Sequence, residues 1–409
     1  MMSSFCKLLS VVSCLHFVNM LPAQNLSDAG ASPQIIPGAE RMSVYLPKLK
    51  GKRIAIYSNH TSMVQNIHLV DTLVRRGVRI QKIFSPEHGF RGTADAGEKI
   101  ENLVDKGTGI KIISLYGKKR KPSADDLNDV DILLFDIQDV GARFYTYISS
   151  LQEFMEASIE HNKPLIVLDR PNPNGFYVDG PVLDKKFKSF IGMQPVPIIY
   201  GMTIGEYAKM LVGEKWLELN ATLKKRKLNL TVIPCSNYTH NSKYVLPVKP
   251  SPNLPEIQST YLYPSTCFFE GTALNEGRGT DKPFQIFGHP SLPSHLYTFT
   301  PTSREGAKNP KLLDKICYGW NLHGTPQEVL DRVNYRIQLK WLIEAYQLFP
   351  QKDSFFLGNG IFFNKLAGND VLIEQIKDEI PESAIRKSWE PALIRFKQIR
   401  KKYLLYKDF

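Results

Sequence analysis

The first half of the chain alternates short apolar runs with stretches of helical periodicity. Apolar residues recur at helix spacing across 147–161, and the apolar runs that fit strands lie at 53–57, 79–84, 110–115, 131–135 and 164–168. Strands that alternate with helical stretches are typical of βαβ units around a parallel sheet. We therefore predict an α/β fold in which this half is a Rossmann-like three-layer sandwich.

The pattern in the second half is less regular. A Gly- and Pro-rich crossover is predicted over 175–205, and an extended Pro-rich loop over 249–255. A long helical pattern covers 326–349, and a basic amphipathic helix is predicted over 386–407. A chain of 409 residues exceeds the size at which one hydrophobic core stops growing, so two domains are expected.

Residues 1–23 have the features of a signal peptide. They carry one charge, Lys7, followed by a mostly apolar run that is too short and too interrupted to span a bilayer stably. The alternative is a lipoprotein leader, because residues 11–14 end in Cys14 and fit a lipid-attachment site. We expect an exported protein, periplasmic or secreted, with no membrane span.

Charge and cysteine content narrow the possible partners. The formal net charge of +12 suits an acidic polymer such as cell-wall glycan, although a solvated lysine-rich surface explains it equally well. We expect no nucleic-acid partner. Outside the leader, Cys235, Cys267 and Cys317 lack any Cys-x-x-Cys spacing, so neither a disulfide framework nor a zinc-cysteine site is indicated.

Polar side chains follow the predicted strands at the point where each strand ends. The carboxyl ends of parallel strands meet at one edge of a sheet, and ligands bind in the crevice there. Residues far apart in the sequence are therefore expected to converge on one site. The candidates are Asn59, Thr61, Glu87, His88, Arg91, Asp136, Gln138, Asp139, Arg143, Tyr145, Asp169, Arg170 and Asn172.

Glu87 is the strongest candidate for a catalytic acid. It lies just past a buried strand, between the apolar side chains of Phe84 and Phe90. Partial desolvation there could raise the pKa of its carboxyl group, so that it protonates a leaving group near neutral pH. Alternatively, Glu87 caps a helix or pairs with Arg91.

Asp136 and Asp139 supply a second carboxylate after the fourth strand. Glycoside cleavage needs two carboxyl groups, about 5–5.5 Å apart for retention and about 6.5–9.5 Å apart for inversion. In the same segment Arg143 could clamp an anionic group of the substrate. The structural alternative is an ion pair between Asp139 and Arg143 that holds the loop.

A glycine-rich segment, 270–280, is the remaining candidate for the site. Three glycines within nine residues, beside Glu270, Glu276 and Arg278, indicate backbone in close approach to a ligand. These charged side chains could complete a sugar subsite, or they could be structural.

Other kinds of site are not favoured by the motifs. No Gly-x-Gly-x-x-Gly follows the first strand, so we expect no dinucleotide cofactor. Gly-x-Ser-x-Gly is absent, which argues against a serine hydrolase. His60, His88, Glu87 and Asp136 could make a metal site, but no usual ligand spacing supports one.

Taken together, the motifs resemble the exo-β-N-acetylmuramidase family NamZ, formerly a domain of unknown function. The resemblance runs from about residue 38 to the end of the chain. One departure is Ser62, where the family's first motif often has glycine. The segments that carry the resemblance are Ser85-Pro86-Glu87-His88-Gly89 with its flanks at 84–92, and 114–117, 135–141, 143–147, 168–173, 200–203, 250–253 and 276–280.

The resemblance implies an exo-acting glycosidase that removes N-acetylmuramic acid from the non-reducing end of peptidoglycan fragments. It implies a Rossmann-like catalytic domain, 38–185, and a smaller α+β C-terminal domain, 186–409, that closes the cleft. Glu87 carries over as the catalytic acid. The second group stays open between Asp136, Asp139, Glu276 and Tyr145, and Arg143 or Arg278 could hold the lactyl carboxylate of muramic acid.

Two alternatives to this enzyme remain open from the sequence. One is a non-catalytic protein that binds wall glycan on the same fold. The other is a metal-dependent hydrolase.

Overall fold

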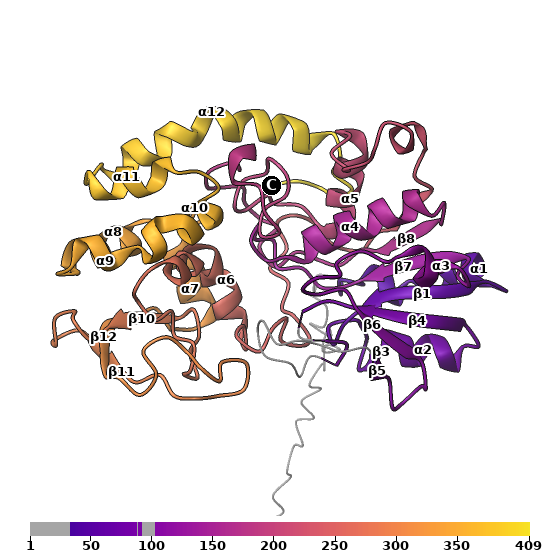
Figure 1. Cartoon of the computed structure of the whole chain (residues 1–409), viewed down its shortest axis with the longest axis horizontal. Helices are drawn as coiled ribbons and strands as arrows, with labels where there is room; N and C mark the ends of the chain where they lie inside the picture. Colours follow the sequence, from indigo (N-terminus) through magenta and orange to yellow (C-terminus); the bar gives the residue numbers. More distant parts are fainter. Residues whose placement is uncertain (1–32, 88, 92–102) are drawn as a thin grey trace, which may run out of the picture. The chain divides into compact units, whose positions relative to one another are not determined.

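A seven-stranded sheet organises the N-terminal half of the fold (Figure 1). The computed structural model describes residues 33–87, 89–91 and 103–409, so the predicted leader and His88 lie outside the described residues. The strand order is β5-β6-β4-β1-β7-β8-β9, and only β5 runs antiparallel to its neighbour. The bounds are β1 (Arg53–Ser58), β4 (Arg79–Ser85), β5 (Leu103–Val104), β6 (Lys111–Ser114), β7 (Ile132–Asp136), β8 (Leu165–Leu168) and β9 (Leu230–Ile233).

The predicted parallel sheet and three-layer sandwich are confirmed. Along β1, Ala55 and Tyr57 pack into one hydrophobic cluster while Ile54 and Ile56 pack into another, because successive side chains point to opposite faces. Helix α4 (Tyr147–Glu160) contributes to the first cluster, and α1 (Met42–Leu49) and α2 (Leu69–Arg75) contribute to the second. Both faces of the sheet are therefore covered, which explains why its strands read as continuous apolar runs.

Strand β9 was not predicted from the sequence. It pairs in parallel with β8 through Leu165–Leu230 to Leu168–Ile233, so the sheet extends past residue 185, where the first domain was expected to end. Only its last residue is buried, because an edge strand packs less of its surface. Its apolar run was too short and too mixed to be recognised as a strand.

The C-terminal part is α+β, as expected. A three-stranded antiparallel sheet, β10 (Ile286–His289), β12 (Cys317–Asn321) and β11 (Tyr297–Phe299), adjoins a set of helices. By contacts between residues, 35–409 form one compact unit. The helices not yet given are α3 (Ala124–Leu127), α5 (Ile204–Gly213), α6 (Ile257–Thr266), α7 (Pro326–Val333), α8 (Lys340–Leu348), α9 (Lys352–Phe355), α10 (Ile361–Ala367), α11 (Val371–Lys377) and α12 (Glu382–Lys401), and a small hairpin joins β2 (Met63–Val64) to β3 (Ile67–His68).

The long helix predicted over 326–349 is wrong in one respect. It divides into α7 and α8, because Asn334 and Tyr335 adopt left-handed backbone conformations with φ of 46° and 55°. A left-handed residue after the last turn is a common way for a helix to end. The tail helix α12 begins and ends earlier than predicted.

The three cysteines outside the predicted leader, Cys235, Cys267 and Cys317, are buried free thiols. Within the ranges that the structure describes, no helix is both long and apolar enough to cross a bilayer.

Two buried charges at the carboxyl edge of the sheet neutralise each other. Asp136 at the end of β7 accepts hydrogen bonds from Arg170 Nε at 2.6 Å and from Arg170 Nη2 at 2.8 Å. Both side chains are almost fully excluded from solvent. Arg170 follows β8, the strand next to β7, so this fork-shaped pair ties the ends of adjacent strands.

Arg143 is buried with no acidic partner among the described residues. Its guanidinium donates to four backbone carbonyls, those of Pro181, Val196, Leu366 and Ala367, at 2.8–2.9 Å. The last two are the final carbonyls of α10, where the helix dipole favours a cation. Burial lowers the pKa of Arg143 to about 9, so the side chain stays charged at neutral pH.

Asp139 is a buried acid held by neutral donors. Its Oδ2 accepts hydrogen bonds from the Tyr200 hydroxyl and from the backbone N–H of Gly141. Burial raises the pKa of Asp139 to about 6, although both donors oppose that shift. The expected pair between Asp139 and Arg143 does not form, since Arg143 binds carbonyls instead.

The raised pKa of Asp139 predicts how stability depends on pH. Between about pH 4 and 6 the folded state binds the extra proton, so this contribution is present below about pH 4 and is lost as pH rises through about 6. We expect wild type to lose on the order of 2–3 kcal/mol relative to Asp139→Asn between pH 4 and pH 7. Urea unfolding of both proteins at each pH measures this. Parallel stability curves would contradict the prediction, and Asp353→Asn on the exposed surface of α9 serves as the control.

Candidate active site

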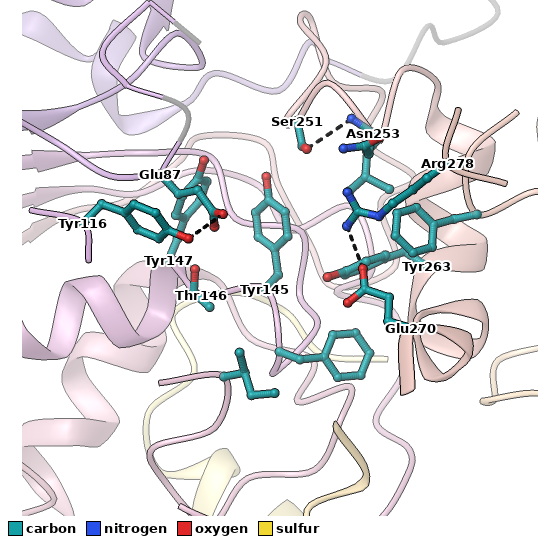
Figure 2. Close-up of a pocket in the computed structure, with 14 residues that line it drawn as sticks. Glu87, Tyr116, Tyr145, Thr146, Tyr147, Ser251, Asn253, Tyr263, Glu270 and Arg278 are labelled. Atoms are coloured by element: carbon teal, nitrogen blue, oxygen red, sulfur yellow. Dashed lines mark hydrogen bonds and ion pairs between the residues drawn. The ribbon is translucent and has the colours of Figure 1, made fainter. Parts of the chain in front are cut away.

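A pocket of about 300 Å³ lies beyond the carboxyl edge of the sheet (Figure 2). Its walls come from both halves of the chain, from segments that follow sheet strands and from the segment 251–284. The residues that line it are Glu87, Tyr116, Phe144, Tyr145, Thr146, Tyr147, Ile191, Ser251, Asn253, Leu254, Tyr263, Glu270, Arg278 and Phe284.

Glu87 lies on one side of the pocket, two residues after β4. Its Oε1 accepts a hydrogen bond from the hydroxyl of Tyr116 at 2.8 Å, and Tyr116 follows β6, the strand next to β4. Burial and the neighbouring Glu87 both raise the pKa of Tyr116, so its hydroxyl stays protonated and donates. Tyr116 thereby fixes the orientation of the carboxyl group.

Two tyrosines stand next to Glu87. The rings of Tyr145 and Tyr147 meet edge to face with their centroids 4.8 Å apart. Tyr145 donates to the carbonyl of Pro250 at 2.7 Å, and the Tyr147 hydroxyl accepts from Nδ2 of Asn59 at 2.8 Å. Burial raises the pKa of both phenols, so neither is ionised near neutral pH.

Glu270 and Arg278 occupy the other side of the pocket. In Figure 2, Tyr145 stands between this pair and Glu87. Nη2 of Arg278 donates to Oε1 of Glu270 at 2.6 Å, and the two side chains are 23% and 20% exposed. Both therefore remain accessible to a ligand in the pocket while holding each other in place.

Four of the predicted site residues line this pocket and lie together: Glu87, Tyr145, Glu270 and Arg278. The structure does not bring Asp136 or Asp139 to its wall, because their carboxyl groups are turned into the protein by Arg170 and by Tyr200. Arg143 is also absent from the wall, since Nη1 and Nη2 of its guanidinium are turned to backbone carbonyls. Asp136, Asp139 and Arg143 therefore have internal contacts in place of the predicted position at the pocket wall.

Asn59, Thr61 and Gln138 form a layer behind the tyrosines. Thr61 donates to Oδ1 of Asn59 at 2.6 Å and accepts from the backbone N–H of Gln138 at 3.0 Å. Asn59 in turn holds Tyr147. The departure from the family motif is accommodated here, because the Ser62 hydroxyl donates to the carbonyl of Asp136.

The other predicted binders have contacts away from the pocket. Arg91 forms ion pairs with Asp71 and Asp105, so the alternative in which it pairs with Glu87 is not what these contacts show. Asp169 accepts from Thr203 and from the backbone of Gly205, and burial raises its pKa to about 7. Asn172, Arg170 and Glu276 are likewise engaged within the protein, with Met202, Asp136 and Lys311 respectively.

Two glycines of the segment 270–280 lie against the chain's own backbone. A Cβ on Gly277 would come within 2.6 Å of the carbonyl of Lys282, and one on Gly279 within 2.7 Å of that of Thr302. Both glycines have φ near +80°. These intramolecular contacts account for the glycines at both positions, and their predicted approach to a ligand stays a prediction.

Several pocket residues were missed by the sequence reasoning. Tyr116 could have been named as a candidate site residue, because it directly follows a predicted strand. Ser251 and Asn253 lie in the Pro-rich loop, and no predicted sheet strand leads into that loop to indicate its position in the fold. For Tyr263 and Phe284 no sequence pattern indicated a place in the pocket.

Within 33–87, 89–91 and 103–409, no three His, Cys, Asp or Glu side chains gather as they would to hold a metal ion.

Comparison with known proteins agrees with this architecture. The family models described as "Exo-beta-N-acetylmuramidase NamZ" match residues 54–258 (N-terminal) and 261–406 (C-terminal). The chain is 38% identical to the peptidoglycan beta-N-acetylmuramidase NamZ of Bacillus subtilis (strain 168), over 88% of this chain and 89% of that protein.

Two solved structures, both of DUF1343 family proteins from Bacteroides fragilis, have the same fold. One superposes with a TM-score of 0.83 at 47% identity, covering 92% of this chain and all of that one. The other has a TM-score of 0.78 at 28% identity, covering 91% of this chain and 99% of that one. With both family models matched in order over most of its length, the chain belongs to the exo-β-N-acetylmuramidase NamZ family.

Proposed function

We propose that this protein is an exo-acting glycosidase that releases β-linked N-acetylmuramic acid from the non-reducing end of peptidoglycan fragments. The observation that carries the proposal is the pair of accessible carboxyl groups, Glu87 and Glu270, in one pocket of a chain from this family. A volume of about 300 Å³ is at the small end for ligand sites, which suits one terminal sugar better than an extended glycan.

Glu87 acts as the acid in this reaction. Held by Tyr116, it donates a proton to the glycosidic oxygen as the bond from that oxygen to the anomeric carbon breaks. The rest of the glycan leaves as an alcohol, and a water molecule finally supplies the hydroxyl on the muramic acid released. No cofactor is needed for this step.

Glu270 supplies the second carboxyl group. The alternatives raised by the sequence are weaker: Asp136, Asp139 and Glu276 are buried in internal contacts, and burial raises the pKa of Tyr145, which disfavours a phenolate nucleophile. The Arg278 guanidinium holds the Glu270 carboxyl group in place through an ion pair. Glu270 then activates the water molecule or attacks the anomeric carbon itself.

Replacing Glu87 tests the acid. With a muramoyl-glucosamine disaccharide, Glu87→Gln should lower kcat by about 10²–10⁴-fold. With 4-nitrophenyl β-N-acetylmuramide the loss should be much smaller, because nitrophenolate leaves without being protonated. Liquid chromatography of the sugar and absorbance of nitrophenol measure the two rates. Equal losses on both substrates would refute an acid role, and Glu344→Gln on the exposed face of α8 controls for the substitution itself.

Replacing Glu270 tests the second group. Glu270→Gln should lower kcat by about 10²-fold or more with both substrates, since help from the leaving group cannot replace activation of the attacking oxygen. Wild-type rates in this variant would exclude Glu270 from the chemistry. Proton NMR of the first-formed anomer on wild type then assigns its role: retention makes it a nucleophile and inversion a base.

The two alternative functions, a non-catalytic glycan-binding protein and a metal-dependent hydrolase, predict different results in the same assays. A protein that only binds wall glycan would retain muropeptides without releasing muramic acid. A metal-dependent hydrolase would lose its turnover on treatment with a chelator and regain it with added metal.

We further infer that the protein acts outside the cytoplasm, next to the wall polymer. The support is the leader at residues 1–23, with its single charge and apolar run. Mass spectrometry of the mature protein should show an amino terminus close to residue 24, or a lipid-modified Cys14 in the lipoprotein alternative. An intact Met1 would contradict export.

A further inference from the structure

The substrate's carboxylate calls for a cation at the pocket. This inference rests on the proposed function, because muramic acid differs from glucosamine by a lactyl group that is ionised at neutral pH. The sequence offered Arg143 and Arg278 for that role. Arg143 is excluded because its guanidinium is buried against four carbonyls.

Arg278 is the cation that lines the pocket among the described residues. Its Nε lies 3.1 Å from Oε1 of Glu276, and its Nη2 donates to Glu270. Nη1 donates no hydrogen bond within the described part of the chain. In Figure 2 the guanidinium is directed toward Asn253 and the space beside Tyr145. A donor edge is therefore available to an acceptor in the pocket.

A buried ion cluster holds Arg278 from behind. Glu276 is 3% exposed and lies between Arg278 and Lys311, whose Nζ is 2.8 Å from its Oε2. Burial would raise the pKa of Glu276, but the charges of Lys311 and Arg278 outweigh it and lower the pKa. Lys311 is itself fixed by the carbonyls of Phe269 and Thr272. Glu276 is thus neutralised by Lys311 as well as by Arg278, so its charge does not depend on Arg278 alone.

The ring beneath the guanidinium is held in an unfavourable backbone conformation. Phe284 has φ of 62°, which is rare for a bulky side chain, and its ring centroid is 5.2 Å from Cζ of Arg278. Its backbone N–H donates to the carbonyl of Glu276 at 2.7 Å. Such strain persists where the surrounding structure over-determines it, and it is concentrated at ligand sites.

We infer that Arg278 is a specificity-determining residue that receives the lactyl carboxylate of the terminal sugar and so distinguishes N-acetylmuramic acid from N-acetylglucosamine. Glu276 and Lys311 are its positioning residues. The lactyl group takes no part in the bond that breaks, so its contact contributes to binding of the substrate and of the transition state alike.

The first test changes the substrate and leaves the protein intact. Wild type is assayed with 4-nitrophenyl β-N-acetylmuramide and with the methyl ester of its lactyl carboxylate. A charge-assisted hydrogen bond of the usual strength predicts a kcat/KM roughly 10- to 100-fold lower for the ester, mainly through KM. An ester cleaved as efficiently as the acid would overturn the inference, since the protein would then not recognise the negative charge of the lactyl carboxylate.

The second test identifies the cation. Arg278→Met should cleave the acid roughly 10- to 100-fold less efficiently than wild type and should no longer distinguish it from the ester. Arg336→Met, at an exposed arginine outside the pocket, is the matched control and should discriminate as wild type does. If Arg278→Met keeps the wild-type ratio of kcat/KM between acid and ester, another group binds the carboxylate and the assignment is wrong.

The ratio of the kcat/KM values for the acid and the ester does not depend on the fraction of the protein that is folded. A partly unfolded Arg278→Met loses the same fraction of its rate on acid and ester, so only a change in their ratio reports on recognition. The two proposals also fail differently. If wild type cleaves neither substrate and no disaccharide, the proposed function is refuted; if it cleaves acid and ester alike, the function stands and the role of Arg278 is refuted.

Discussion

The buried guanidinium of Arg143 is the contact on which the pocket depends. It binds carbonyls of the crossover segment, Pro181 and Val196, and the last carbonyls of α10, Leu366 and Ala367. Residues 144–147 follow immediately and line the pocket. A buried cation without these acceptors would be very costly, so the loop that carries the tyrosines cannot leave the C-terminal helices without exposing or abandoning a charge.

Charged groups at the carboxyl edge divide into two kinds by their solvation. Asp136 and Arg170 neutralise each other away from water, and Asp139 is held by the neutral donors Tyr200 and Gly141. Groups satisfied in this way hold strand ends and loops in register but cannot meet a substrate. Glu87 and Glu270, which reach the pocket, are oriented by Tyr116 and Arg278 instead. At this edge the buried charges hold the scaffold, and Glu87 and Glu270 face the pocket.

The two walls of the pocket are built by different physical means. On the sheet side, side chains follow adjacent parallel strands, so the spacing of the strands brings Tyr116 close to Glu87. On the other side Tyr263 lies on α6, Glu270 lies in a short 3-10 helix and Arg278 lies in a loop. A loop with two left-handed glycines, Gly277 and Gly279, is fastened by the ion cluster of Glu276, Arg278 and Lys311. Contacts between residues far apart in the sequence therefore form the second wall, and the local sequence pattern does not predict it.

Much of the first wall followed from the sequence alone. Periodicity predicted the parallel strands of the sheet other than the edge strand β9, because buried parallel strands are continuous apolar runs, and the rule that their carboxyl ends share an edge made Glu87 a site residue. The motifs between residues 84 and 280, read together, indicated the family. Tertiary structure alone decided which charges face the pocket. Asp136, Asp139, Arg143 and Glu270 are equally polar in the sequence, but only the packing of residues distant along the chain determines whether a charge is desolvated and paired or left accessible to a substrate.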